Sequence, residues 1–162
     1  MPRDNEAPEG GANASTVNDF MKKGDTPTNA MKTLREIQEH YRNDKFATNA
    51  GCVITEAGEN RVVCEMPLTE KTQNAHGGVM GGAIFTLADL AFAVASNYDG
   101  TPTVGVECNI RYFSPPRGER LTAVCVPDKT GRTLSHYTVD ITDETGRKVA
   151  CFTAIAFHKR SE

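Results

Sequence analysis

The sequence lacks an excess of basic residues. Its 18 Lys and Arg residues stand against 21 Asp and Glu residues, which gives a formal net charge of -3. Proteins that bind nucleic acid neutralise its phosphates with clustered Lys and Arg, and neither such a cluster nor a known binding motif is present. Nucleic acid is therefore not expected as a partner.

The sequence also lacks a long hydrophobic run. Its longest apolar segment, Ala83 to Ala95, is interrupted by Asp89. At about 13 residues, the segment is shorter than the roughly 20 that a transmembrane helix needs. The first stretch, MPRDNEAPEGGANAS, has neither the apolar centre nor the cleavage pattern of a signal peptide. We therefore expect a soluble, cytoplasmic protein with no membrane partner.

Cysteine and histidine show no pattern of a metal site or a disulfide framework. The cysteines are odd in number, widely spaced and mostly within apolar segments, which predicts buried, reduced thiols. The four histidines have no metal-ligand spacing, so no metal is expected. The cysteines are Cys52, Cys64, Cys108, Cys125 and Cys151.

Several catalytic and nucleotide-binding motifs are missing as well. No Gly-x-Ser-x-Gly elbow occurs, so the His-Gly-Gly sequence at residues 76–78 is not supported as the oxyanion loop of a serine hydrolase. No Lys-Ser/Thr pair follows the Gly-rich stretch, which excludes a P-loop, and the spacing is not a dinucleotide fingerprint. We interpret His76 as a loop residue.

Composition divides the chain into two regions. Residues 1–27 are rich in Pro, Gly, Asn and charged residues, which cannot bury enough apolar surface to offset the entropy of ordering. We expect a disordered tail there and a single domain over residues 28–162. A short amphipathic helix should begin the domain, with Thr28 or Asn29 as its cap and an end near Asn43. Its apolar stripe is Met31, Leu34, Ile37 and Tyr41.

Strand patterns occupy much of the remainder. Residues 52–56 and 61–66 are β-branched runs on either side of a turn signal, which predicts a hairpin. Residues 104–112 alternate apolar with polar side chains, which predicts a strand with one face in water. Its apolar positions are Val104, Val106, Cys108, Ile110 and Tyr112. Turn signals separate this strand from three more, 121–126, 134–142 and 148–158, and together they predict an antiparallel meander.

Between the hairpin and these strands lies an unusually apolar segment. Residues 82–95 are rich in Ala, Leu and Phe and contain no turn signal, which predicts a buried helix that is apolar nearly all round. The order of elements therefore predicts an α+β domain in which a curved antiparallel sheet wraps around a central helix.

Asp89 is the one charge in that helix. An unpaired buried charge costs several kcal/mol, so Asp89 either faces a wet seam or has a function. A Gly-rich loop that runs into a helix presents unpaired N–H groups beside the positive end of the helix dipole, which suits an anion or a developing oxyanion. Close packing in a tight turn also requires Gly. The glycines concerned are Gly77, Gly78, Gly81 and Gly82.

The spacing of Gly81 and Asp89 has a consequence for assembly. The two residues are eight positions apart, or about 12 Å along a helix that rises about 1.5 Å per residue. One reacting carbonyl cannot touch both of them on the same helix. Two such helices running antiparallel about a two-fold axis would bring Gly81 of one copy opposite Asp89 of the other. This hypothesis requires a dimer with two shared sites.

The stretch NAHGGVMGGAIFTLAD, residues 74–89, resembles the signature of hotdog-fold acyl-CoA thioesterases of the phenylacetate-degradation (PaaI-like) type. The matching positions are Asn74, Gly77, Gly81, Gly82 and Asp89. The later stretches VGVECNIRYFSPP, GRTLSHYTVDITDETGRKVA and FTAIAFHK are similar to the remaining strands of that family, so the resemblance covers roughly residues 30 to 160.

The resemblance implies a hotdog dimer, assembled further to a homotetramer, that hydrolyses a small, medium or aromatic acyl-CoA. Asp89 would act as general base on a water or attack the thioester itself, and the Gly81 N–H would stabilise the oxyanion. Asn74 would orient the carbonyl or the water, across the interface from Asp89. Coenzyme A (CoA) is part of the substrate, and no cofactor is implied.

The resemblance also bears on substrate binding. Gly77 and Gly82 of the signature are expected to line the substrate site. The phosphates of CoA need cations near the mouth of the site, and Arg132 is the first candidate for them, the alternative being an ordinary solvated charge at a turn. Further cations nearby in the sequence are Lys129, Arg111 and Arg117.

Two positions depart from the family pattern. Met80 stands where the family usually has His, and Gly105 stands where some members have a Ser that holds the water, with Thr103 as a possible substitute. These departures favour, as an alternative, a non-catalytic module that binds or senses acyl-CoA on the same fold. A hydratase or dehydratase of this fold would require His76 to reach Asp89.

Overall fold

The structure is a computed structural model that describes residues 33–159. The expected disordered tail, residues 1–27, lies outside the described residues, as do Thr28, Asn29 and Met31 of the expected first helix. The described helices are α2 (Leu34–Tyr41), α3 (Lys45–Asn49) and α4 (Gly81–Ser96), with a short 3-10 helix, η1 (Glu70–Thr72). The strands are β1 (Val53–Gly58), β2 (Arg61–Pro67), β3 (Thr103–Tyr112), β4 (Arg120–Lys129), β5 (Leu134–Asp143) and β6 (Lys148–His158).

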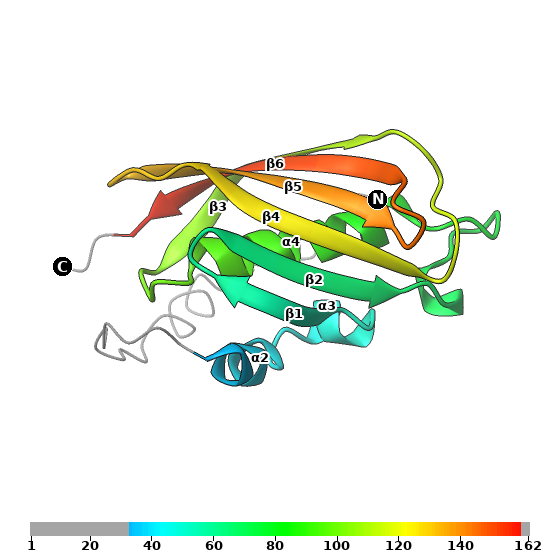
Figure 1. Ribbon diagram of the computed structural model, residues 1–162, viewed down its shortest axis with the longest axis horizontal. Coiled ribbons are helices and arrows are strands. Elements are labelled where there is room, and N and C mark those ends of the chain that lie inside the picture. Colours follow the sequence, from blue (N-terminus) through cyan, green and yellow to red (C-terminus); the bar gives the residue numbers. More distant parts are fainter. Residues whose placement is uncertain (1–32, 160–162) are drawn as a thin grey trace, which may run out of the picture.

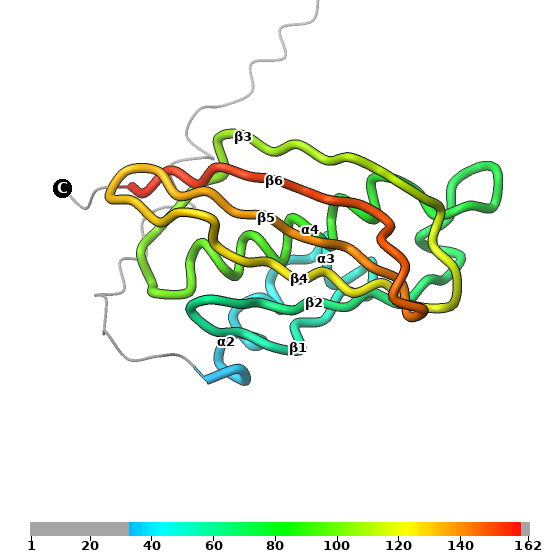
Figure 2. Tube along the Cα trace, turned by 45° about the horizontal axis from the view of Figure 1, so that its top comes forward, coloured from blue at the N-terminus to red at the C-terminus, as the bar shows by residue number. Residues whose placement is uncertain are grey.

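The six strands form one antiparallel sheet in the order β1-β2-β4-β5-β6-β3. The sheet curves over α4, which packs along its inner face (Figures 1 and 2). The predicted α+β hotdog fold, a curved antiparallel sheet around a central helix, is confirmed. None of the helices within residues 33–159 is long and apolar enough to cross a membrane.

The core lies between α4 and the sheet. The helix buries Leu87, Ala88 and Ala91 completely, and the sheet meets them with the fully buried side chains of Met66 and Phe152, among others. Small residues on α4 let the strands approach closely, while Leu87 fills the space between them. Since apolar burial contributes about 25 cal/mol per Å², this contact stabilises the domain.

We expect Leu87→Ala to lower the free energy of unfolding by about 2–5 kcal/mol, because a fully buried Leu side chain leaves a cavity that the core refills only in part. Urea denaturation monitored by circular dichroism measures the change. The matched control is Val53→Ala, whose side chain is 51% exposed and whose loss should cost about 0.5 kcal/mol or less. Equal effects of the two substitutions would contradict this assignment of the core.

The N-terminal helix differs from the expectation. Thr33 caps α2 in a capping box, in which its hydroxyl accepts the Glu36 N–H while the Glu36 carboxylate accepts the Thr33 N–H. The helix ends at Tyr41, and Asp44 then caps the short helix α3, which the sequence analysis missed. Because α3 is little more than one turn long, it has no hydrophobic period that could reveal it.

Strand β3 is the second difference. Only β4, β5 and β6 form a meander, whereas β3 crosses to the far edge of the sheet and pairs with β6, so the expected four-strand meander is wrong in its first strand. A bulge at Val106 also shifts the register of β3 against β6. Before the bulge, Val104 lies beside the exposed Phe157 on the outer face, whereas Cys108 and Ile110 pair with buried residues of β6 and face α4. One extra residue thus splits the predicted apolar face.

Candidate active site

The N-terminus of α4 presents free donors. Met80 is its N-cap residue and makes no side-chain hydrogen bond to the first turn. Within residues 33–159, no group accepts the backbone N–H of Gly81 or Gly82. A helix of 16 residues adds its positive dipole end to these two donors. The start of α4 is therefore suited to an oxygen atom that carries negative charge.

Asn74 builds the loop in front of this helix. Its Oδ1 accepts the backbone N–H groups of His76 at 2.9 Å and Gly78 at 3.2 Å. The Asn74 N–H donates to the Gly78 carbonyl at 2.7 Å, and Gly77 provides a positive φ of 78° that other residues rarely adopt. The Asn74 oxygen is thus used within the loop, whereas no group in the described part of the chain accepts a hydrogen bond from its Nδ2. His76 lies in this loop, as predicted.

Tyr112 packs on the first turn of α4. Its hydroxyl donates to the Gly81 carbonyl at 2.8 Å, and a Cβ added at Gly81 would lie 3.2 Å from its ring. On the other side, the Met80 side chain lies over Gly82, where a Cβ would be 3.2 Å from Cε of Met80. Glycine at both positions therefore lets two larger side chains close around the helix start.

Asp89 lies two turns further along α4, on a stripe of the helix that is exposed at Gly82 and Asp89 and half-buried at Thr86 and Ala93. The sheet does not cover this stripe. The helix is therefore not buried nearly all round, contrary to the expectation from the sequence. Neighbouring protein atoms nevertheless remove water from the carboxylate. This desolvation, followed by the negative charge of Asp44, raises the pKa of Asp89 above its ordinary value of 3.8. Raised values of this kind are typical of a carboxylate that accepts a proton in catalysis.

The strand side of Asp89 is formed by β3. A Cβ at Gly105 would lie 3.1 Å from the Phe92 ring and 3.7 Å from the Cys108 sulfur, so a Ser at this position would press on Phe92. Desolvation, and then the charge of Asp89, raise the pKa of the Cys108 thiol. Cys108 could not be predicted as a neighbour of Asp89, since only the bulge in β3 turns this thiol towards α4.

The expectation of buried, reduced cysteines is only partly met. All five are free thiols, but Cys108 is exposed in the isolated chain and Cys151 is half-buried. Burial raises the pKa of the Cys52 thiol to about 11 and that of Cys125 to about 12, so both stay protonated at neutral pH. Within residues 33–159, no three His, Cys, Asp or Glu side chains gather in a way that could hold a metal ion.

Thr103 does not lie beside Asp89. Its hydroxyl bonds to the Ser96 hydroxyl at 3.0 Å, and its N–H donates to Asn97 Oδ1 at 3.0 Å, both at the C-terminal end of α4. That end lies seven residues beyond Asp89, or about 10 Å along the helix. Thr103 therefore fixes the end of α4 and does not replace the family Ser.

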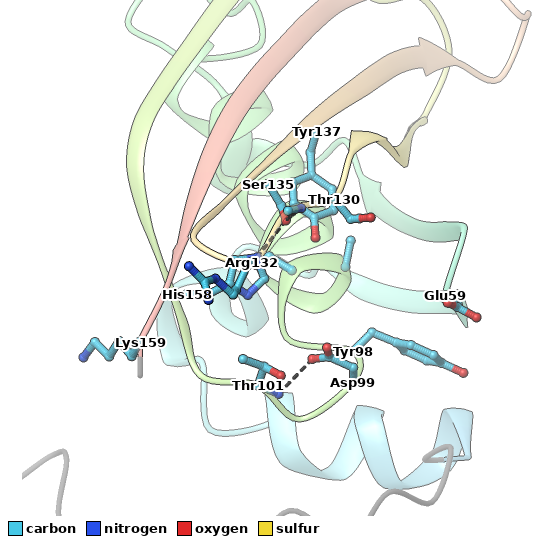
Figure 3. Close-up of a pocket in the computed structure, with 13 residues that line it drawn as sticks. Glu59, Tyr98, Asp99, Thr101, Thr130, Arg132, Ser135, Tyr137, His158 and Lys159 are labelled. Carbon is cyan, nitrogen blue, oxygen red and sulfur yellow. Dashed lines mark hydrogen bonds between the residues drawn. The ribbon is translucent and has the colours of Figure 1, made fainter. Parts of the chain in front are cut away.

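Arg132 lines a cavity of about 530 Å³ at the same end of α4 (Figure 3). Other parts of its wall come from Tyr98, Asp99, Ser135 and His158. Arg132 is thus distant from Gly77, Gly81 and Gly82 within one chain. The predicted site residues therefore form three groups. Asn74, Gly77, Gly81 and Gly82 lie in the loop and at the start of α4, Asp89 lies in the middle of α4, and Arg132 lies at the cavity near its C-terminal end.

Comparisons with known proteins agree with this fold and loop. The sequence profile of the thioesterase superfamily matches residues 76–150. The chain is 34% identical to the acyl-coenzyme A thioesterase PaaI of Escherichia coli over 122 residues, which cover 75% of this chain and 87% of that protein. It is 36% identical to human acyl-coenzyme A thioesterase 13 over 129 residues, which cover 76% of this chain and 92% of the human protein.

Solved structures agree as well. The structure of the E. coli PaaI protein from the phenylacetic acid degradation operon superposes with a TM-score of 0.74 at 28% sequence identity, over 82% of this chain and 98% of that one. Sequence profile, full-length relatives and fold thus converge with the signature around Asn74, Gly81 and Asp89. The chain belongs to the PaaI-like acyl-CoA thioesterases of the hotdog-fold thioesterase superfamily.

Proposed function

We propose that the protein hydrolyses a small, medium or aromatic acyl-CoA to the free acid and CoA, in sites shared between two copies of the chain. The observation that carries this proposal is the arrangement along α4. At its start lie two N–H groups that no group within residues 33–159 accepts, and a carboxylate with a raised pKa lies on a partly uncovered stripe of the same helix.

The chemistry follows from these groups. Ionised Asp89 takes a proton from a water molecule, and the resulting hydroxide attacks the thioester carbonyl carbon. The Gly81 N–H, with Nδ2 of Asn74, stabilises the negative charge on the carbonyl oxygen. Collapse of the tetrahedral intermediate breaks the C–S bond and releases CoA as a thiolate, which takes the proton held by Asp89 and so restores the carboxylate. If Asp89 attacks the carbonyl itself, a mixed anhydride forms, and water then hydrolyses it.

Dimer formation completes this site. Within one chain, Gly81 and Asp89 are about 12 Å apart along a continuous helix, too far to contact one carbonyl. A second copy packed on the uncovered stripe would supply the missing half and cover the exposed Val106 and Tyr112 of the edge strand β3. Exposed Val104, Leu134 and Phe157 on the outer face of the sheet support a further association to the homotetramer.

Substrate binding extends over the length of the helix. Gly77 has open space beside it for the thioester at the helix start, and at Gly82 only the side chain of Met80 would have to move. Arg132 and the cavity it lines offer a cation and sufficient volume for the phosphates and nucleotide of CoA. The cytoplasmic location stays a prediction.

The test is release of free thiol from a panel of short, long and aromatic acyl-CoAs, measured with the wild-type protein. We expect turnover of short, medium or aromatic members. The alternative, a non-catalytic acyl-CoA binding module, is favoured by Met80 and Gly105 in place of the family His and Ser. Tight binding of one acyl-CoA in calorimetry, with no thiol released from any member, would establish that alternative.

The pH dependence of hydrolysis should report Asp89. Only the ionised carboxylate can accept a proton, so the rate should rise with pH through a midpoint above 3.8. Asp44→Asn removes the second cause of the raised pKa while an Asn can still cap α3, so the midpoint should move to lower pH. The measurement is kcat against pH for both proteins, and an unchanged midpoint would contradict the electrostatic contact.

A further inference from the structure

The turn between β4 and β5 carries Arg132 and has little freedom. A Cβ at Gly131 would lie 2.6 Å from the carbonyl oxygen of Leu134, so no other residue fits this position without moving the backbone. Arg132 itself is exposed and follows directly. The direction in which Arg132 leaves the turn is therefore set by whatever holds residues 131–133.

Two side chains hold this turn from inside the cavity wall (Figure 3). Ser135, at the start of β5, is completely buried, and its hydroxyl accepts the Gly131 N–H at 3.2 Å. The same hydroxyl lies 2.7 Å from Nε2 of His158, near the end of β6. The backbone N–H of His158 also donates to the Thr133 carbonyl at 2.9 Å. His158 thus holds the turn at two points. Its backbone N–H bonds to the turn directly, and its side chain acts through Ser135.

Packing alone does not explain this polar pair. The following inward positions of β5 are Tyr137, Val139 and Ile141, all buried, and a small apolar residue at position 135 would fit the same pattern. A buried hydroxyl is tolerated only when its hydrogen bonds are made, so the pair is costly to leave incomplete. It also does not form a serine nucleophile, because within residues 33–159 no carboxylate is hydrogen-bonded to His158.

We propose that Ser135 and His158 are positioning residues, which fix the turn at residues 131–133 and so hold Arg132 at the cavity for the phosphate groups of CoA. The inference rests on the proposed function, since it takes the CoA thioester as the ligand. Neither residue touches the reacting carbonyl, which lies at the other half of α4. Their loss should therefore weaken binding of the nucleotide part of the substrate and leave the chemical step unchanged.

The experiment compares two substrates that carry the same acyl group. One is the acyl-CoA, and the other is the N-acetylcysteamine thioester, which has the reacting carbonyl and sulfur but no phosphate. For Ser135→Ala and His158→Gln we expect a KM for acyl-CoA raised about tenfold, the loss typical of one displaced charge-assisted contact. The kcat should not change, and neither constant should change for the short thioester. Arg132→Ala should show the same split.

A double-substituted protein and a control sharpen the test. If Ser135 acts through Arg132, the Arg132→Ala/Ser135→Ala protein should have the KM of Arg132→Ala alone. Thr138→Ala is the matched control. It removes a hydroxyl that bonds to Asp128 on the exposed face of the same strand, and the variant should behave as wild type.

The outcomes separate the inference from the proposal beneath it. A raised KM for Arg132→Ala with a normal KM for Ser135→Ala and His158→Gln would overturn the positioning role and leave the CoA site intact. A normal KM for Arg132→Ala would overturn the CoA site and the inference together. An equal loss of kcat/KM on both substrates would also overturn the inference, because it would indicate a general structural role of the substituted residue. Thermal unfolding of each variant would reveal such a role directly.

Discussion

Replacing Asp89 with Asn is expected to reduce kcat for acyl-CoA hydrolysis by about 10²–10⁴-fold, the range that a positioned general base contributes. The amide has nearly the shape of the carboxylate but cannot accept the proton of the attacking water. If Asp89 is instead the nucleophile, the loss should be at least as large, because no anhydride can form. Thiol release under saturating substrate measures the effect.

The fold should survive this substitution. Desolvation raises the pKa of Asp89 in the folded chain. A carboxyl whose folded pKa is raised contributes stability at low pH, and that contribution is lost as pH rises through the folded pKa. At neutral pH, the neutral Asn should therefore be tolerated at least as well as the ionised Asp. We expect a Tm for Asp89→Asn equal to or above that of wild type.

The matched control is Asp140→Asn. Asp140 is an exposed carboxylate on the outer face of the sheet, and it pairs with Lys148 at 2.8 Å. Exposed pairs contribute about 0–1 kcal/mol, so this variant should keep wild-type activity. If the Asp89→Asn protein is folded and still fully active, Asp89 has no part in the mechanism and is only a polar residue that faces water.

Mixing two inactive variants is expected to restore activity. Asn74→Ala should be impaired, because it removes the donor Nδ2 and the acceptor that holds the loop through His76 and Gly78. If each site takes Asp89 from one copy and Asn74 from the other, a mixed dimer of Asn74→Ala and Asp89→Asn has one intact site. Random exchange makes half of the dimers mixed, so about a quarter of the wild-type activity should return.

This experiment requires that the subunits exchange, which mild denaturation followed by refolding of an equimolar mixture achieves. The control is the double variant Asn74→Ala/Asp89→Asn mixed with wild type. If the sites are shared, both sites of each mixed dimer are singly defective, so about a quarter of the activity of an all-wild-type sample should remain, whereas sites within one chain would keep about half. No recovery from the two single variants after verified exchange would show that each site lies within one chain, contrary to the shared-site hypothesis.

Local pattern was sufficient for the central elements of this fold. The hairpin of β1 and β2 follows from β-branched runs around the turn at Glu59 and Asn60, and α4 follows from a long apolar segment without a turn signal. Both signals are contiguous in the chain and strong, because each reflects a periodicity or a turn chemistry that neighbouring residues share. The expected bounds of α4 were wrong by only one residue at each end.

The errors occurred where pairing is long-range or elements are short. The partner of β3 is β6, and nothing in the sequence of either strand specifies that choice over β4. The bulge at Val106 depends on how β3 curves around α4, yet it decides that Cys108 faces Asp89. The cap of α2 is Thr33, which forms a capping box with Glu36, and this local Thr-x-x-Glu pattern is present in the sequence although Thr28 or Asn29 was expected.

Residue type and spacing along one chain were enough to predict the class of fold, the Gly-rich start of the central helix and the isolation of Asp89 within it. Three further features depend on packing between distant residues: which face of α4 stays partly uncovered, which thiol lies near Asp89, and the contact of Ser135 with His158 beneath the turn of Arg132. Residues 135 and 158 become neighbours solely through the pairing of β5 with β6, and such contacts between distant residues leave no periodic trace in a single sequence.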